Sequence, residues 1–197
     1  MKFTKMQGLG NDYLYVFAAA LPPHVKALSK RLSDRHFGAG ADGMIFILPS
    51  DRADFMMRIF NADGSEAEMC GNGIRCVGKY VYDKGYTDKT RLTVETPAGI
   101  KTLLLHTAGG KVQTVTVDMG HVAVGAPQTV TVTDNTVRLT PVNMGNPHAV
   151  VFMHGIDNLD LSGIGPQFEH HPLFPRRTNT EFVEVVGRHH LKMRVWE

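Results

Sequence analysis

The chain has 197 residues, of which 43% are hydrophobic and 20% charged, and its formal net charge at pH 7 is +2. This length suits one large domain or two small ones, and the near-neutral charge does not favour nucleic acid or a membrane surface as a partner. The N-terminal residues carry no apolar signal sequence, no apolar run is long enough to span a bilayer, and two cysteines cannot form a disulfide framework. We therefore expect a cytoplasmic protein.

Segments rich in β-branched and aromatic residues dominate the chain and predict strands. They lie at residues 13–17, 44–48, 55–60, 91–96, 100–105, 112–118, 137–142, 149–153, 182–186 and 191–196. Helices are predicted over residues 25–35, from the Gly71-Asn72-Gly73 turn to about residue 84, and more weakly between 161 and 170. Gly109-Gly110 is a hairpin signal. The pattern indicates an α+β fold with mostly antiparallel sheets.

The sequence also resembles itself. MQGLGNDYLYVF (residues 6–17) parallels VNMGNPHAVVFM (residues 142–153), and FMMRIFN (residues 55–61) parallels LKMRVWE (residues 191–197). Two matches at nearly equal spacing indicate a duplicated unit, although short β-rich segments can also look alike by chance. We expect an N-terminal domain at residues 1–118 and a C-terminal domain at 119–197. The first copy continues into a cysteine motif and the second does not, so the second domain is expected to be incomplete.

Both cysteines, Cys70 and Cys76, flank the sequence GNGIR. Cys70 precedes Gly71-Asn72-Gly73, where the second helix is expected to begin. Backbone N–H groups at a helix start are unpaired and partially positive, so they lower the pKa of a nearby thiol and can bind a carboxylate. Glycines let a ligand approach the backbone closely. The turn therefore offers a base and an anion site side by side, which suits an amino acid.

Other roles for the two cysteines are possible. A metal site usually has closer spacing and more ligands, and the helix between the two thiols makes poor geometry for a redox disulfide. Cys70 could also be a small buried residue in a glycine-rich turn. Cys76 lies within the predicted helix among apolar residues, and we expect it to be a core thiol without chemistry.

Several polar residues in or beside turns are candidate ligand contacts. Turn chemistry alone could explain each of them, but neutral amides can both accept from an ammonium and donate to a carboxylate. His148 lies in the second copy's equivalent of the first copy's GND turn. The asparagines are Asn11, Asn61, Asn72, Asn146 and Asn179.

Five motifs together resemble the diaminopimelate epimerase family nearly end to end: MQGLGNDY, RHFGAGADG, NADGSEAEMCGNGIRC, MGNPH and MRVWE. The resemblance implies two similar α/β domains, each with a mostly antiparallel sheet around a helix, and a cleft between them. It implies cofactor-independent interconversion of LL- and meso-diaminopimelate, on the route to lysine and peptidoglycan. It also implies a small amino-acid substrate and, as a possibility, a homodimer.

The resemblance also implies roles for particular residues. Cys70 is similar to one of two catalytic cysteines, which work on opposite faces of the α-carbon. The implied substrate-binding residues are Asn11, Asn61, Gly71, Asn72, Asn146 and Asn179, and the implied residues that tune cysteine protonation are His148 and Glu197. The family's second cysteine motif follows the position of Glu197, so we expect the 197-residue chain to be inactive alone.

Two other functions stay open from the sequence. A relative with the same architecture could isomerise a different amino-acid-like substrate, as proline-type racemases and a phenazine-pathway isomerase do. The chain could also be a non-catalytic binding fragment that retains half of a site. The combination of the CGNGIRC motif with five asparagines in turns favours diaminopimelate.

Overall fold

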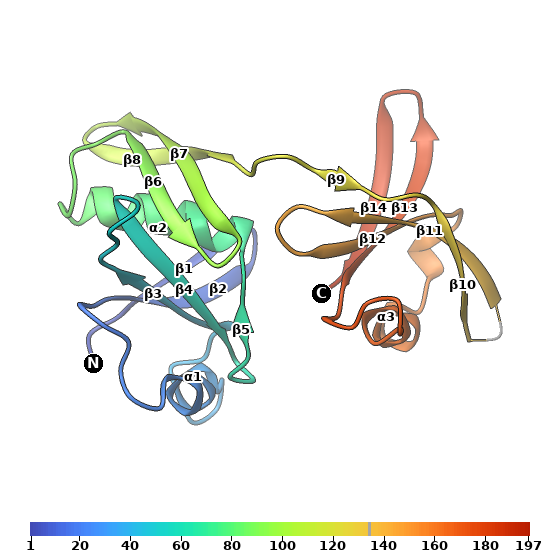
Figure 1. Ribbon diagram of the computed structural model, residues 1–197, viewed down its shortest axis with the longest axis horizontal. Coiled ribbons are helices and arrows are strands. Elements are labelled where there is room, and N and C mark those ends of the chain that lie inside the picture. Colours follow the sequence, from blue (N-terminus) through green and yellow to red (C-terminus); the bar gives the residue numbers. More distant parts are fainter. Residues whose placement is uncertain (134) are drawn as a thin grey trace. The chain divides into compact units, whose positions relative to one another are not determined.

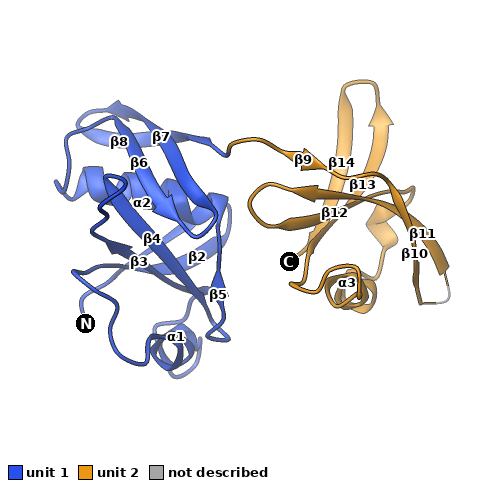
Figure 2. Ribbon diagram, in the orientation of Figure 1, with its two compact units in different colours: residues 1–119 blue, residues 120–197 orange. Residues whose placement is uncertain are grey.

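The computed structural model describes residues 1–133 and 135–197. The chain divides into two compact units, Met1–Met119 and Gly120–Glu197 (Figure 2). Each unit has its own sheet and its own hydrophobic core. Within the described residues, no helix has the length and apolar character needed to cross a membrane.

The elements follow one another in chain order as labelled in Figure 1. Unit 1 contains β1 (Thr4–Gly8), β2 (Asn11–Phe17), α1 (Val25–Ser33), β3 (Gly43–Leu48), β4 (Phe55–Asn61), β5 (Glu66–Ala67), α2 (Gly71–Asp83), β6 (Arg91–Thr96), β7 (Gly99–Ala108) and β8 (Lys111–Asp118). Unit 2 contains β9 (Ala123–Val124), β10 (Gln128–Val132), β11 (Asn135–Asn143), β12 (Pro147–Phe152), a 3-10 turn (Ile156–Asn158), α3 (Leu161–Glu169), β13 (Asn179–Gly187) and β14 (His190–Trp196).

The sheet of unit 1 is covered on both faces. Its strand order is β1-β2-β3-β4-β6-β7-β8, with β5 added to β4, and only the β2–β3 and β4–β6 pairs are parallel. Alternate residues of β2 and β3 point to opposite faces: Tyr15 and Ile45 pack with α2, whereas Leu14 and Met44 pack with α1. All six residues of β3 are therefore buried. The helix α2 lies within the curl of the sheet (Figure 1).

The sheet of unit 2 has the order β10-β11-β12-β13-β14, with β9 added to β11. The helix α3 packs on this sheet through Phe168, which meets Phe182 of β13 in an edge-to-face contact. Gly165 makes room for Trp196, because a Cβ at Gly165 would lie 2.2 Å from the indole ring. The indole Nε1 donates to Glu169 at 2.8 Å. These contacts fix the end of β14, and with it the position of the residue that follows.

The two units repeat one topology, which confirms the pseudo-repeated fold expected from the sequence. In unit 1 an antiparallel β1–β2 pair is followed by α1, a parallel β2–β3 pair and an antiparallel β3–β4 pair. In unit 2, β11–β12, α3, β12–β13 and β13–β14 follow in the same order with the same directions. Both helices contain nine residues. The register matches too, since Tyr13 faces Gly43 in one unit and His148 faces Asn179 in the other.

Some boundaries differ from the sequence prediction. The first helix ends at Ser33, because the side chain of Asp34 accepts from the N–H groups of His36 and Phe37, both at 2.7 Å, and so starts a turn. The strands β1, β5, β9 and β10 were not predicted. The hairpin at Gly109-Gly110 is confirmed, with φ values of 59° and 72° that favour glycine.

Candidate active site

Cys70 is the N-cap residue of α2. Its backbone is extended, with φ −142° and ψ 111°, and its Sγ accepts a hydrogen bond from the N–H of Gly73 at 3.3 Å. The thiol is half-buried. A sulfur at an N-cap lies on the partially positive end of the helix, and the N–H bond stabilises its thiolate form. Cys70 is therefore placed to act as a base.

The first turn of α2 can also hold an anion. Helix geometry leaves the N–H groups of Gly71 and Asn72 without an acceptor inside the helix. The space above Gly71 is open, since a Cβ added there would have no heavy atom within 4 Å. Asn72 packs against Gly8, whose added Cβ would lie 3.2 Å from the Asn72 carbonyl oxygen. A carboxylate can reach these amides directly beside the sulfur.

Two side chains from β2 face Cys70. The side chain of Asn11 lies 3.8 Å from Sγ through its Oδ1 atom. The Tyr13 side chain is 5% exposed, and its phenol pKa is raised by burial and by the nearby Cys70 and Asp42. Tyr13 therefore stays a neutral hydroxyl beside the thiol. Gly43 makes room for it, because a Cβ at Gly43 would lie 2.9 Å from the tyrosine ring and 2.3 Å from the carbonyl oxygen of Phe60. A side chain at position 43 would therefore displace the backbone of β4 or the Tyr13 ring.

An ionic cluster holds the start of β2. Arg35 donates to Asp12 at 2.7 Å and to Asp42 at 2.8 Å, and Lys5 lies 3.0 Å from Asp12. The Arg35 guanidinium holds the pKa of Asp12 well below its usual range. The N–H of Asp12 also donates to the Asp42 carboxylate at 2.8 Å. Because Asn11 directly precedes Asp12, this cluster fixes the asparagine beside the sulfur.

Asn61 lies at the end of β4, opposite Gly43 in the ladder. Its carbonyl oxygen accepts from the Ser29 hydroxyl of α1 at 3.0 Å, and its side-chain amide donates to Ser65 at 3.0 Å. Unit 1 therefore carries Asn11, Asn61 and the Cys70 turn around the ends of neighbouring strands.

In unit 2 the register brings a second set of polar groups together. His148 on β12 lies opposite Asn179 on β13, and Glu181 follows Asn179 on the same face of the strand. His148 Nδ1 lies 2.7 Å from Glu181 Oε1. Glu197 is exposed and follows Trp196, the register partner of Thr180. Asn146 is half-buried in the turn before β12, where its carbonyl oxygen accepts from the N–H of Met144 at 3.3 Å.

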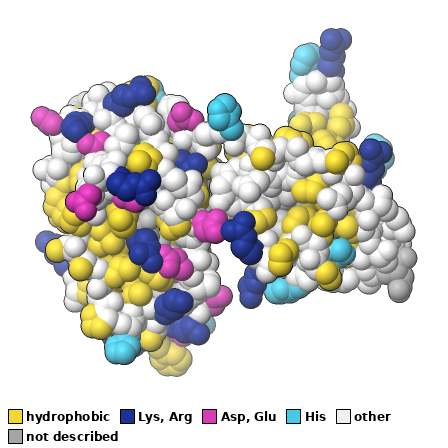
Figure 3. All heavy atoms as spheres, in the orientation of Figure 1, with side chains coloured by type: hydrophobic (Ala, Val, Ile, Leu, Met, Phe, Trp, Pro, Cys, Tyr) yellow, Lys and Arg dark blue, Asp and Glu magenta, His cyan; other side chains and the backbone are white. Residues whose placement is uncertain are grey.

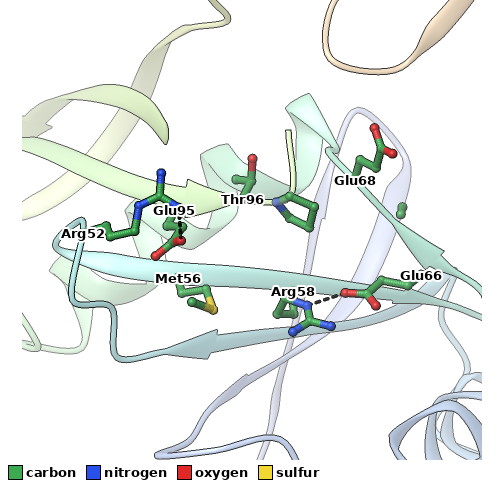
Figure 4. Close-up of a pocket in the computed structure, with 9 residues that line it drawn as sticks. Arg52, Met56, Arg58, Glu66, Glu68, Glu95 and Thr96 are labelled. Atoms are coloured by element: carbon green, nitrogen blue, oxygen red, sulfur yellow. Dashed lines mark hydrogen bonds and ion pairs between the residues drawn. The ribbon is translucent and has the colours of Figure 1, made fainter. Parts of the chain in front are cut away.

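A separate cavity of about 500 Å³ lies elsewhere on unit 1 (Figure 4). Its two guanidinium groups are already paired, Arg52 with Glu95 at 3.1 Å and Arg58 with Glu66. The lining contains neither Cys70 nor any of the candidate asparagines. Figure 3 shows acidic and basic side chains interspersed on the visible face, without a large surface of one sign. Neither feature competes with the Cys70 turn as the candidate site.

The fold resembles that of a racemase and an epimerase of known structure. A probable proline racemase from Agrobacterium radiobacter K84 aligns with a TM-score of 0.72 at 15% identity, over 98% of this chain and 69% of that protein. A hydroxyproline epimerase from Agrobacterium vitis aligns with a TM-score of 0.68 at 16% identity, over the same shares of the two chains. At these identities the likeness establishes the architecture.

Sequence comparison identifies the family. The family model for diaminopimelate epimerase matches residues 3–124 and 140–197. Diaminopimelate epimerases from Desulfovibrio desulfuricans and Methanococcus maripaludis are 52% and 53% identical over the whole of this chain, which spans 76% of each relative. A third, from Acetivibrio thermocellus, is 52% identical and is spanned to 75%. The chain belongs to the diaminopimelate epimerase family, as its motifs indicated.

Three residues of the site region were missed by sequence reasoning. Tyr13 was assigned to a strand and to the MQGLGNDY motif but to no role in the site, although it occupies the repeat position that His148 has in the second copy. Glu181 follows Asn179 by two residues, a spacing that places two side chains on one face of a strand and was the available signal. Arg35 begins the RHFGAGADG motif, but the motif does not indicate its contact with Asp12, which is created by the tertiary fold.

Proposed function

We propose that this chain acts at the α-carbon of diaminopimelate, interconverting the LL and meso forms without a cofactor, in the synthesis of lysine and peptidoglycan precursors. The observation that carries the proposal is the position of Cys70: a half-exposed thiol at a helix N-cap, bonded to a backbone N–H and adjacent to open amides. Family membership supports the choice of substrate.

The chemistry follows from this geometry. The α-carboxylate of the substrate binds the N–H groups of Gly71 and Asn72, which brings the α-carbon close to Cys70. The thiolate takes the α-proton: an S–H bond forms, the C–H bond breaks, and its electron pair delocalises into the carboxylate. The same amides then stabilise the added negative charge, which is the electrostatic contribution expected to be largest. Asn11 and Asn61 are proposed to bind the remaining polar groups of the substrate.

Inversion needs a second proton donor on the opposite face of the α-carbon. Cys76 cannot supply it, because it lies on the same helix as Cys70, 7% exposed and packed in the core. We therefore propose that Cys70 removes the proton from one face and that a group other than Cys76 supplies the proton on the opposite face. In unit 2, Asn146 and Asn179 are proposed substrate contacts, and His148 and Glu197 are proposed to tune proton transfer.

Calorimetric titration with LL-diaminopimelate, L-lysine and L-proline tests the substrate. Lysine lacks the distal carboxylate and would leave donors unpaired, at about 1–3 kcal/mol per buried group. We expect diaminopimelate to bind roughly 5- to 150-fold more tightly than lysine. Equal or tighter binding of lysine or proline would favour a related isomerase of another substrate. A cytoplasmic location and a homodimer complete the proposal, and light scattering tests the dimer.

A further inference from the structure

A carboxylate and an imidazole meet on the face of unit 2 that carries Asn179. His148 Nδ1 and Glu181 Oε1 are 2.7 Å apart, and the two side chains are only 19% and 15% exposed. They come from the parallel strands β12 and β13, in which His148 pairs with Asn179 and Val150 pairs with Glu181. The contact is therefore set by backbone register and not by two flexible surface side chains.

This contact determines which ring nitrogen carries the proton. A carboxylate can only accept a hydrogen bond, so Nδ1 must donate and carries the hydrogen of the neutral ring. The lone pair of a neutral His148 then resides on Nε2, which is left to exchange a proton with another group. The other oxygen of Glu181, Oε2, is buried and has no hydrogen-bond partner among the described residues. The histidine is thus the group that compensates burial of this carboxylate.

A nearby pair shows what an unconstrained contact looks like. His154 Nδ1 lies 3.6 Å from Glu184 Oε1, beyond hydrogen-bond distance, and the His154 side chain is 93% exposed. The two pairs belong to the same unit and contain the same residue types. His154 and Glu184 therefore provide an internal control for any property assigned to the buried pair.

We propose that Glu181 is a positioning residue for proton transfer: it holds the His148 ring in one orientation, with hydrogen on Nδ1 and the lone pair on Nε2. The role of His148 in proton transfer rests on the proposed function, but the position of the ring hydrogen on Nδ1 does not depend on it. Glu181 acts through His148 and does not need to touch the substrate.

Nitrogen-15 NMR of histidine-labelled protein tests the proposal without substrate. At about pH 9, where histidines of ordinary pKa are neutral, long-range ¹H–¹⁵N correlations should show His148 with protonated Nδ1 and bare Nε2. Glu181→Ala should abolish this preference, and Glu181→Gln should weaken it, because an amide can turn either its oxygen or its NH₂ group toward Nδ1. Glu184→Ala should leave His148 unchanged. A wild-type His148 with hydrogen on Nε2, or one that Glu181→Ala does not alter, would overturn the proposal.

A kinetic measurement separates this inference from the proposed function. Exchange of the α-hydrogen of LL-diaminopimelate in deuterated water should slow about tenfold or more in Glu181→Ala and less in Glu181→Gln. It should be unchanged in Glu184→Ala. Absence of exchange in the wild type would count against the proposed function and leave the NMR result standing. Equal exchange in all four proteins would show that the tautomer has no role in proton transfer, against the positioning role. If Glu181→Ala does not fold, the wild type and Glu181→Gln decide both readouts.

Discussion

Replacing Gly73 by alanine should destabilise unit 1 and disturb Cys70. Gly73 is buried at the third position of α2, and its N–H donates to the N-cap sulfur of Cys70 at 3.3 Å. A Cβ added there would lie 2.6 Å from Cδ1 of Ile45 and 3.4 Å from Sγ. The Ile45 side chain has no exposed surface, so its Cδ1 atom cannot move without displacing other core groups.

The expected loss of stability in Gly73→Ala follows from three contributions. Overpacking a core typically costs about 1–3 kcal/mol, and disturbing an N-cap bond costs about 1 kcal/mol. Alanine returns about 1 kcal/mol through helix propensity. We expect the free energy of unfolding to fall by about 1–3 kcal/mol. Gly71→Ala is the matched control, because its Cβ meets nothing within 4 Å, and it should change stability by 0 to about +1 kcal/mol.

Urea unfolding of both variants, followed by circular dichroism, measures the difference. The structure predicts that Gly73→Ala unfolds at a clearly lower urea concentration than Gly71→Ala. Gly71→Ala should instead weaken diaminopimelate binding at unchanged stability, because its methyl group occupies the open space beside the amides. Equal stability of the two variants would refute the assigned packing of the Cys70 turn.

Two further predictions concern the thiols and the ionic cluster. Iodoacetamide near neutral pH, with peptide mapping, should label Cys70 at least about tenfold faster than the buried Cys76; equal rates would remove the basis for calling Cys70 reactive. Arg35→Met should lower the free energy of unfolding at pH 7, because it removes the guanidinium that pairs with Asp12 and Asp42. Because Arg35 depresses the Asp12 pKa, this stabilisation exists above the unfolded-state pKa of about 3.9 and is lost as pH falls toward the folded value. Urea unfolding at pH 7 and pH 3 should show that the difference in free energy of unfolding between the wild type and Arg35→Met becomes smaller at pH 3. An unchanged difference would contradict the pairing of Arg35 with Asp12 as its cause.

Strands with continuous apolar character were predictable from local sequence. Residues 44–48 are all apolar and form most of the fully buried β3. Strand β1 was missed because Met6 is the only large apolar residue in Thr4–Gly8. It forms because β2 offers a partner through five register pairs, and a propensity argument does not contain that partner.

The candidate site likewise combines features that local sequence predicts with contacts that only the tertiary fold creates. The Cys70 turn was readable because its glycines, helix start and thiol are contiguous in sequence. The contact between His148 and Glu181 joins residues that are far apart in the chain and exists only in the parallel register of β12 and β13. Likewise, Arg35 reaches Asp12 only after α1 has packed on the sheet. Local motifs therefore identify the candidate reacting group, and tertiary register supplies the residues around it.

Deuterium incorporation into LL-diaminopimelate is the most direct test of Cys70 as the α-proton base. The 197-residue protein is incubated with LL-diaminopimelate in deuterated water, and chiral chromatography with mass spectrometry reports exchange and inversion separately. We expect deuterium at the α-carbon of diaminopimelate in the wild type and in Cys76→Ala but not in Cys70→Ala. Exchange that survives Cys70→Ala would contradict the assignment of Cys70 as the base.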